Sequence, residues 1–266
     1  MAKQFQSWSQ HADDYIAWQL VGKPKRGIVV EVGAFDGVHL SNSYSLEQLG
    51  WQAICIEPNP RIFQFLRTQR PNAININKAI VGKEDIDEVV FYDEEIGVLS
   101  GVSYDEKDIK KRYKNRGLEY REPNKITVAA ATLTQVLDEH LNNPVIDVVS
   151  IDVEGLEVEV LKGLDLDKYE VKLFIIEANT DAETEAILRF FKKHRNYYFI
   201  GTNRQNLFLL NRKYAEKGFL RNLDFENYQP ATQKHPIDDK LTLQSVPPKF
   251  RDAPGFKKLQ KRYWFW

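Results

Sequence analysis

The chain has 266 residues, of which 42% are hydrophobic and 28% charged, and its 37 basic side chains are balanced by 38 acidic ones. This length suits one large core, or one core with an appendage, and the near-zero net charge excludes a whole-molecule attraction to nucleic acid or anionic membranes. The single cysteine, Cys55, excludes an intrachain disulfide and a cysteine-based zinc site.

The N-terminal sequence MAKQFQSWSQHADDY lacks the apolar stretch of a signal peptide. No apolar run approaches the ~20 residues that span a bilayer. We therefore expect a cytoplasmic protein without a transmembrane segment. Residues 1–24 are expected to form a helical segment that covers the functional site.

From residue 25 onward, short apolar runs alternate with amphipathic stretches. The apolar runs predict strands at 27–33, 52–58, 73–81, 145–152 and 171–179, with a further edge strand at 88–93. The amphipathic stretches predict helices at 41–50, 60–70, 132–141, 157–164 and 182–194. Two last runs, YYFIG (197–201) and NLFLLN (206–211), predict a closing antiparallel hairpin. The alternation predicts an α/β fold over 25–211, with a doubly wound and mostly parallel sheet.

Two segments fall outside this alternation. Residues 94–125 form a long polar insert, of a length that is typical of lids and disordered loops. Residues 212–266 form an extension rich in proline and aromatic residues, which ends in FKKLQKRYWFW. Its aromatic content argues against a purely disordered tail, so we expect it to pack on the core or on a partner, and its last residues could also touch a membrane surface.

The turn after the first predicted strand, EVGAFDG, is the first candidate binding site. Ligands of open α/β sheets bind at the carboxyl ends of strands, and the glycines permit close approach to the backbone. The spacing Gly33-x-x-x-Gly37, with Phe35 and Asp36 between, suits a cationic ligand without phosphates better than a dinucleotide. S-adenosylmethionine meets that description, and Glu57 at the end of the second strand is placed to accept its ribose hydroxyls. The predicted cofactor-binding residues are Glu31, Gly33, Ala34, Asp36, Gly37, Asn42, Glu57, Pro58 and Ala79.

Beyond this turn, an ordered set of segments resembles the FkbM family of S-adenosylmethionine-dependent methyltransferases. These are SQHADDY (9–15), VEVGAFDGVHLSNSYSLEQLGW followed by ICIEPNP, LSG (99–101), TLTQVL (132–137) and SIDVEGLEVEVLKG (150–163). The resemblance implies the class I methyltransferase fold, which is Rossmann-like, and O-methylation of a small molecule, often a sugar or natural product. Ser150 departs from the family, which frequently has Lys before IDVEG.

The acceptor side is expected at the same edge of the sheet. Asp152 and Glu154 directly follow a strand and are the candidates for a general base, and His39 is a third candidate. Asp152, Glu177 and Asn179 are also possible ligands of Mg²⁺. The small residues of LSG are expected to line the acceptor pocket. The remaining histidines, His11, His140, His194 and His235, are interpreted as bystanders, although His11 could reach the site from the N-terminal segment.

The function that these features favour is O-methylation of a hydroxylated small molecule, such as a sugar or a glycan or natural-product precursor, including acidic acceptors. Two alternatives stay open. The eight Lys and Arg between Lys107 and Lys125 would suit an RNA methyltransferase, and the fold could also serve as a non-catalytic cofactor-binding module. A homo-oligomer is compatible with the sequence.

Overall fold

A computed structural model describes residues 4–215, 223–238 and 241–253. Its centre is an eight-stranded sheet in the order β4-β3-β2-β8-β9-β11-β10-β15. The first five of these strands are parallel, and the last three are each antiparallel to their neighbour. Their bounds are β2 (Ile28–Val32), β3 (Gln52–Ile56), β4 (Ile74–Ile76), β8 (Val145–Ile151), β9 (Glu170–Glu177), β10 (Tyr197–Asn203), β11 (Asn206–Asn211) and β15 (Phe250–Asp252).

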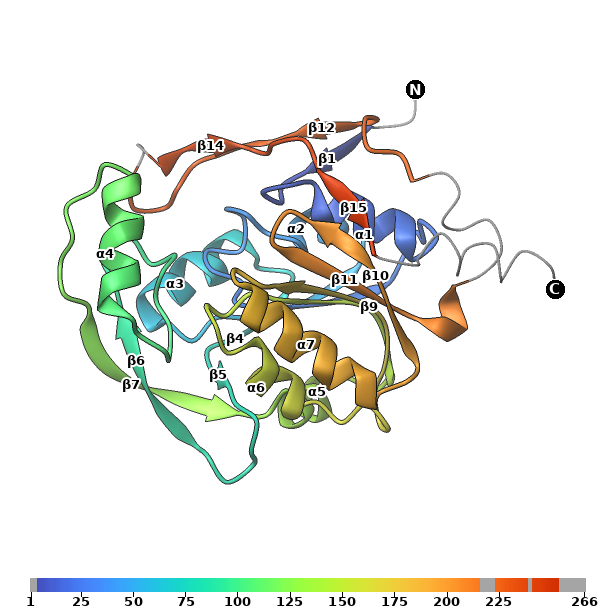
Figure 1. The fold of residues 1–266 in the computed structure, drawn as a ribbon, viewed down its shortest axis with the longest axis horizontal. Coiled ribbons are helices and arrows are strands. Elements are labelled where there is room, and N and C mark those ends of the chain that lie inside the picture. Colours follow the sequence, from blue (N-terminus) through green and yellow to red (C-terminus); the bar gives the residue numbers. More distant parts are fainter. Residues whose placement is uncertain (1–3, 216–222, 239–240, 254–266) are drawn as a thin grey trace.

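Helices cover both faces of this sheet (Figure 1). Alternate residues of each strand point to opposite faces, so Val30 of β2 packs with α5, α6 and α7, whereas Val29 packs with α1, α2 and α3. The predicted doubly wound α/β fold with a closing hairpin is therefore confirmed. The helices are α1 (Asp13–Leu20), α2 (Tyr44–Gln48), α3 (Pro60–Gln69), α5 (Leu133–His140), α6 (Glu157–Lys162) and α7 (Asp181–Lys193).

The predicted strand at 73–81 is wrong as a single element. After β4 the chain leaves the main sheet, and β5 (Ala79–Ile80) joins a separate three-stranded sheet with β7 (Asn124–Ala131) and β6 (Glu88–Asp93). The break lies at Asn77, whose side-chain amide donates to the carbonyls of Glu57 and Pro58 at 2.7 and 3.0 Å. This turn brings β5 beside the end of β3.

The insert between β6 and β7 is folded. Its helix α4 (Glu106–Asn115) begins after Asp105, whose side chain accepts the N–H groups of Lys107 and Asp108. The helix packs one apolar side on the loop before it. We call the resulting group the insert cluster: Ile96, Leu99, Ile109 and Tyr113. The insert thereby has a small core of its own beside the main sheet.

The two terminal segments pair with each other. Strand β1 (Phe5–Ser7) is parallel to β12 (Tyr228–Pro230), and β13 (Thr232–Gln233) is antiparallel to β14 (Leu243–Gln244). A 3-10 turn, Arg212–Tyr214, follows β11. In Figure 1 β1, β12 and β14 run along one side of the molecule toward α4. The C-terminal run FKKLQKRYWFW, expected to pack on the core or a partner, lies outside the described residues.

No described helix has the length and apolarity that crossing a membrane requires.

Candidate active site

A cavity of about 620 Å³ opens at the carboxyl ends of β2, β3, β8 and β9. Strand order reverses between β2 and β8, and this reversal is where open α/β sheets place their ligands. The volume lies in the range of small-molecule sites. Of the predicted residues, those that line it are Glu31, Gly33, Ala34, His39, Asn42, Glu57, Pro58, Ala79, Asp152, Glu154, Glu177 and Asn179.

The turn after β2 is packed tightly against the turn after β8. Gly33 has φ +86°, and a Cβ there would lie 1.8 Å from the carbonyl oxygen of Asp152. The N–H groups of Gly33 and Ala34 both donate to the carbonyl of Ile56, at 3.0 and 2.9 Å. Only glycine fits the first position, and it fixes the spacing between two walls of the cavity.

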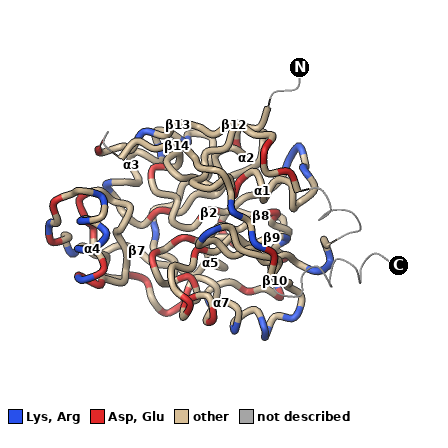
Figure 2. Tube along the Cα trace, turned by 45° about the horizontal axis from the view of Figure 1, so that its top comes forward, with Lys and Arg blue, Asp and Glu red and all other residues tan. Residues whose placement is uncertain are grey.

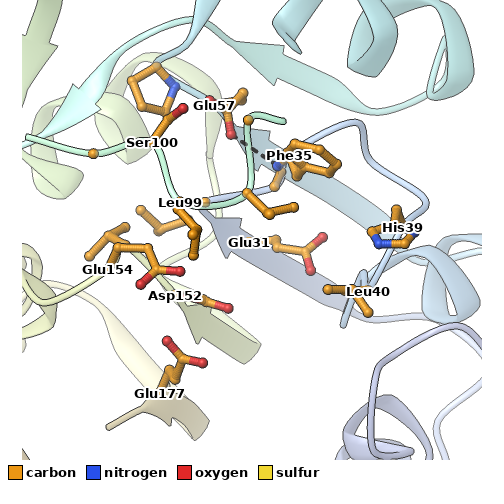
Figure 3. A pocket seen from close by; sticks show the side chains of 18 of the residues that line it. Glu31, Phe35, His39, Leu40, Glu57, Leu99, Ser100, Asp152, Glu154 and Glu177 are labelled. Atoms are coloured by element: carbon orange, nitrogen blue, oxygen red, sulfur yellow. Dashed lines mark hydrogen bonds between the residues drawn. The ribbon is translucent and has the colours of Figure 1, made fainter. Parts of the chain in front are cut away.

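Glu57 ties the turn after β2 to β3. Its carboxylate accepts the N–H of Phe35 at 3.0 Å (Figure 3). It also accepts the N–H of Asn59 at 2.7 Å. Burial raises the pKa of Glu57 to about 8, and the two hydrogen bonds, which favour the charged form, only partly offset this effect. The carboxylate is therefore held in a fixed place on the cavity wall, where an acceptor of ribose hydroxyls was predicted.

Glu31 is held by the next segment of the same turn. Its carboxylate accepts the hydroxyls of Ser41 and Ser43 at 2.7 and 2.6 Å and the N–H of Asn42 at 2.5 Å. Burial is the main cause that raises its pKa. The side chain of Asn42 donates to Ser150 Oγ at 3.0 Å, and its buried Oδ1 has no partner among the described residues. Ser150 thus positions Asn42.

Asp36 and Gly37, also predicted as cofactor-binding residues, do not line the cavity. One carboxylate oxygen of Asp36 accepts the N–H groups of Val38 and His39 at 2.9 and 2.7 Å, and the other accepts the amide of Gln69 at 2.9 Å. The side chain stabilises its own turn, as Asp often does. Gly37 lies against the side chain of Arg70.

Three acidic side chains form what we call the carboxylate cluster: Asp152, Glu154 and Glu177. One carboxylate oxygen of each lies within 4.8 Å of the others. Burial, followed by the charges of Glu177 and Glu154, raises the pKa of Asp152 well above its usual value. Burial and the charge of Glu177 raise the pKa of Glu154 to about 7, although Arg112 opposes this. The cluster therefore holds protons near neutral pH.

Two contacts limit what the carboxylate cluster can bind. Arg112 of α4 donates to Glu154 at 2.8 Å, and Asn179 turns its amide nitrogen to Glu177 at 2.7 Å. Glu154 is thus already paired with a cation, and Asn179 does not present its oxygen to the same carboxylate. The predicted Mg²⁺ site at Asp152, Glu177 and Asn179 gains no support from this arrangement.

Three residues of the cavity wall have a strained backbone. Phe35, Leu40 and Glu154 have φ of +49°, +62° and +55°, although none is glycine. Non-glycine residues adopt such angles rarely, and only where surrounding contacts hold them. Three further described residues with positive φ, Ala12, Lys23 and Arg204, do not line the cavity.

The histidines are distributed differently from the prediction. His39 lines the cavity, but Figure 3 shows it across Glu31 from Asp152. His235, interpreted as a bystander, also lines the cavity, and its ring centroid lies 5.1 Å from that of His39. Both imidazoles are buried, and burial lowers the pKa of each to about 4. His11 is buried within the N-terminal segment; it does not line the cavity, and neither do His140 and His194.

Several residues of the cavity wall were not predicted. The insert supplies Leu99, Ser100 and Gly101, as expected, but also residues of α4. The terminal segments supply a second group, for which no local sequence signal exists because these residues come close to the cavity only through the tertiary fold. The unpredicted residues include Gln10, Arg112, Arg116, Gln205, Leu241 and Leu243.

The arrangement fits S-adenosylmethionine. Glu57 presents a fixed carboxylate for the ribose hydroxyls. Glu31 is an acidic group on the cavity wall that suits the positively charged cofactor. Asn42 Oδ1 is a buried acceptor without a partner among the described residues. Glycine at position 33 keeps side-chain atoms away from the contact between the two turns.

Comparison with known proteins gives a family and distant structural likenesses. The model of the methyltransferase FkbM domain matches residues 31–199. No curated protein matches the chain.

Three solved structures illustrate the likenesses. Precorrin-6y C5,15-methyltransferase from Geobacter metallireducens GS-15 is 12% identical, over 74% of this chain and 84% of that chain, with a TM-score of 0.40. TrmK from M. capricolum, in complex with S-adenosyl-homocysteine, is 13% identical, over 77% and 68%, with a TM-score of 0.41. The N-terminal domain of human METTL16 is 11% identical, over 74% and 66%, with a TM-score of 0.42.

At these identities and TM-scores the three structures carry no argument about the reaction. The family match is different in kind, because it spans more than half of the chain and includes the turn after β2, the end of β3 and the carboxylate cluster. The chain therefore belongs to the methyltransferase FkbM domain family, and it is a class I methyltransferase that uses S-adenosylmethionine.

Proposed function

We propose that the protein methylates a hydroxyl oxygen of a small molecule, such as a sugar or a glycan or natural-product precursor. The observation that carries this proposal is the position of Glu154. Its carboxylate lies in the cofactor cavity, beside Asp152 and Glu177, and its pKa is raised to about 7. A general base works best when its pKa is near the working pH.

The cofactor supplies a methyl group on a sulfonium, whose leaving group needs no protonation. The protein must therefore align the acceptor and remove its proton. Glu57 and Glu31 lie on the β2 and β3 side of the cavity, and the carboxylate cluster lies on the β8 and β9 side. This separation leaves the cluster available to the acceptor.

Within the cluster the three acids have different parts. Burial and the charges of Glu177 and Glu154 raise the pKa of Asp152, and in its protonated form Asp152 can donate a hydrogen bond to the acceptor. Arg112 lowers the pKa of Glu154 and orients its carboxylate through the 2.8 Å hydrogen bond. Glu154 is then the group that accepts the hydroxyl proton.

Replacing Glu154 by Gln tests this assignment. The variant keeps the size of the side chain but cannot accept the proton, so we expect kcat to fall by about 10²–10⁴-fold. The assay measures formation of S-adenosylhomocysteine with a panel of sugars and hydroxylated natural-product precursors. In the unchanged protein, kcat should rise with pH through about 7, and the variant should lose this rise.

Glu185→Gln is the matched control, because Glu185 is exposed on α7 and pairs only with Arg189 in the contacts described. It should leave kcat and its pH profile unchanged. Equal activity of Glu154→Gln and the unchanged protein would overturn the assignment of the base. Binding of S-adenosylhomocysteine without turnover of any acceptor in the panel would instead favour a non-catalytic module.

A further inference from the structure

Residues 241–246 cross the cavity as a segment that we call the strap, and they lie outside the region that the family model matches. Strand β14 of the strap pairs with β13, where Gln233 is fully buried. The Gln233 side chain accepts the N–H of Leu40 and donates to Ser245 Oγ at 2.9 Å. The strap is thereby fixed to the turn after β2.

Both ends of the strap lie next to contacts of the carboxylate cluster. At one end the N–H of Val246 donates to the carbonyl of Gln10 at 2.9 Å. The side chain of Gln205 donates to Gln10 Oε1 at 3.3 Å. The carbonyl of Gln205 in turn accepts the N–H of Ala178, the residue after Glu177, at 2.9 Å.

At the other end Leu241 packs against the insert cluster. Two members of that cluster, Ile109 and Tyr113, belong to α4, the helix whose Arg112 pairs with Glu154. The strap therefore runs from Gln10 of the N-terminal segment to the insert that carries Arg112.

The strap presents an apolar surface to the cavity. Leu241 and Leu243 line the cavity and are half-buried, whereas Thr242 and Gln244 are exposed. This alternation is that of an extended chain with one face turned inward. Val98 and Leu99 of the insert line the same cavity. Among the described residues, the partly exposed Leu241 and Leu243 leave apolar area open to a ligand in the cavity.

We propose, building on the proposed function, that the acceptor carries an apolar group beside its reactive hydroxyl, and that Leu241 and Leu243 select it by binding this group. The strap then acts as a specificity element that the family domain by itself does not supply. An alkyl or aromatic substituent would gain affinity from burial against the two side chains. A bare sugar would leave them in contact with water.

Two alkyl glucosides test this proposal. Protein saturated with S-adenosylhomocysteine is titrated with methyl and octyl β-D-glucoside, below the micelle concentration, by isothermal calorimetry. We expect the octyl compound to bind at least about 10-fold more tightly, since an apolar pocket discriminates by about that factor for even a small group. The variant Leu241→Ser/Leu243→Ser should lose this preference.

Val246→Ser is the matched control, because Val246 belongs to the strap but does not line the cavity. It should keep the preference. The affinity for S-adenosylhomocysteine reports whether each variant is folded, and Leu243→Ala replaces the double variant if that one is not. Equal binding of the two glucosides, no binding of the octyl compound, or a preference that survives in the leucine variants would overturn the proposal.

The same compounds separate this proposal from the proposed function. If methyl glucoside is methylated and the octyl chain gives no gain in affinity, the proposed role of the strap is overturned and the proposed hydroxyl methylation is not. Preferred binding of octyl glucoside without methyl transfer from S-adenosylmethionine counts against the proposed hydroxyl methylation and supports the role of the strap.

Discussion

At the scale of single residues, His39 gives the protein a specific response to acid. Burial lowers its pKa to about 4, from an ordinary value of 6.5. Between these pH values the unfolded chain binds more protons at this position, so its contribution to stability is complete above pH 6.5 and is lost as the pH falls toward 4. His39→Phe removes this contribution. We expect the free energy of unfolding to fall by about 1–2 kcal/mol more in the unchanged protein than in the variant when the pH goes from 7 to 5.

Urea unfolding of both proteins at the two pH values measures this loss. The comparison cancels the opposite effect of Glu57, whose raised pKa weakens the fold as the pH rises from 4.5 toward 8. A difference in unfolding free energy between variant and unchanged protein that is the same at pH 7 and pH 5 would contradict the prediction.

Sequence reasoning placed Glu31, Glu57, Asp152 and Glu154 on the cavity because each comes at or near the end of a parallel strand, and those ends meet at one edge. It did not foresee that Asp36 stabilises its own turn, because a carboxylate in a tight turn can bind either a ligand or its own backbone. The choice depends on side-chain geometry, here the N–H groups of Val38 and His39.

At the scale of elements, the contact between the turns after β2 and β8 depends on Gly33. We expect Gly33→Ala to lower the free energy of unfolding by about 1–3 kcal/mol more than Gly117→Ala does, because overpacking adds that much to the strain of a positive φ. Gly117 has φ +68°, and a Cβ there would meet nothing within 4 Å. Gly117→Ala therefore measures the strain of a positive φ without any overpacking. Equilibrium unfolding in urea measures both variants, and similar losses would contradict this account.

The main strands were predictable since each is a run of residues buried on both faces between turn residues. Strand β7 was missed because it starts with Asn and Lys, ends in three alanines, which are weak strand formers, and follows a polar insert. The division of 73–81 into β4 and β5 was missed because Asn77 bonds to carbonyls of a different strand end. No pattern local to those residues records such a contact.

At the scale of the whole molecule, the charge distribution argues against RNA as acceptor. Figure 2 shows basic and acidic residues mixed along α4. Lys110, Arg112 and Arg121 of the insert pair with Glu106, Asp108, Glu154 and Glu95. We expect a mixed-sequence RNA oligonucleotide to bind more weakly than about 10⁻⁴ M in fluorescence anisotropy at about 50 mM salt. Tighter binding that falls by about 10³-fold or more at about 200 mM salt would restore the RNA methyltransferase alternative.

The pairing of the two terminal segments has a consequence for biosynthesis. Ser245 Oγ donates to the carbonyl of Ser7, which is 238 residues earlier in the chain, and β12 adds to β1 over its whole length. Contacts so distant in sequence form late, because a ribosome releases the second partner long after the first. The parallel part of the central sheet, from β4 to β9, can thus fold on a nascent chain before residues 228–252 are released, and the cavity gains Leu241 and Leu243 only after that.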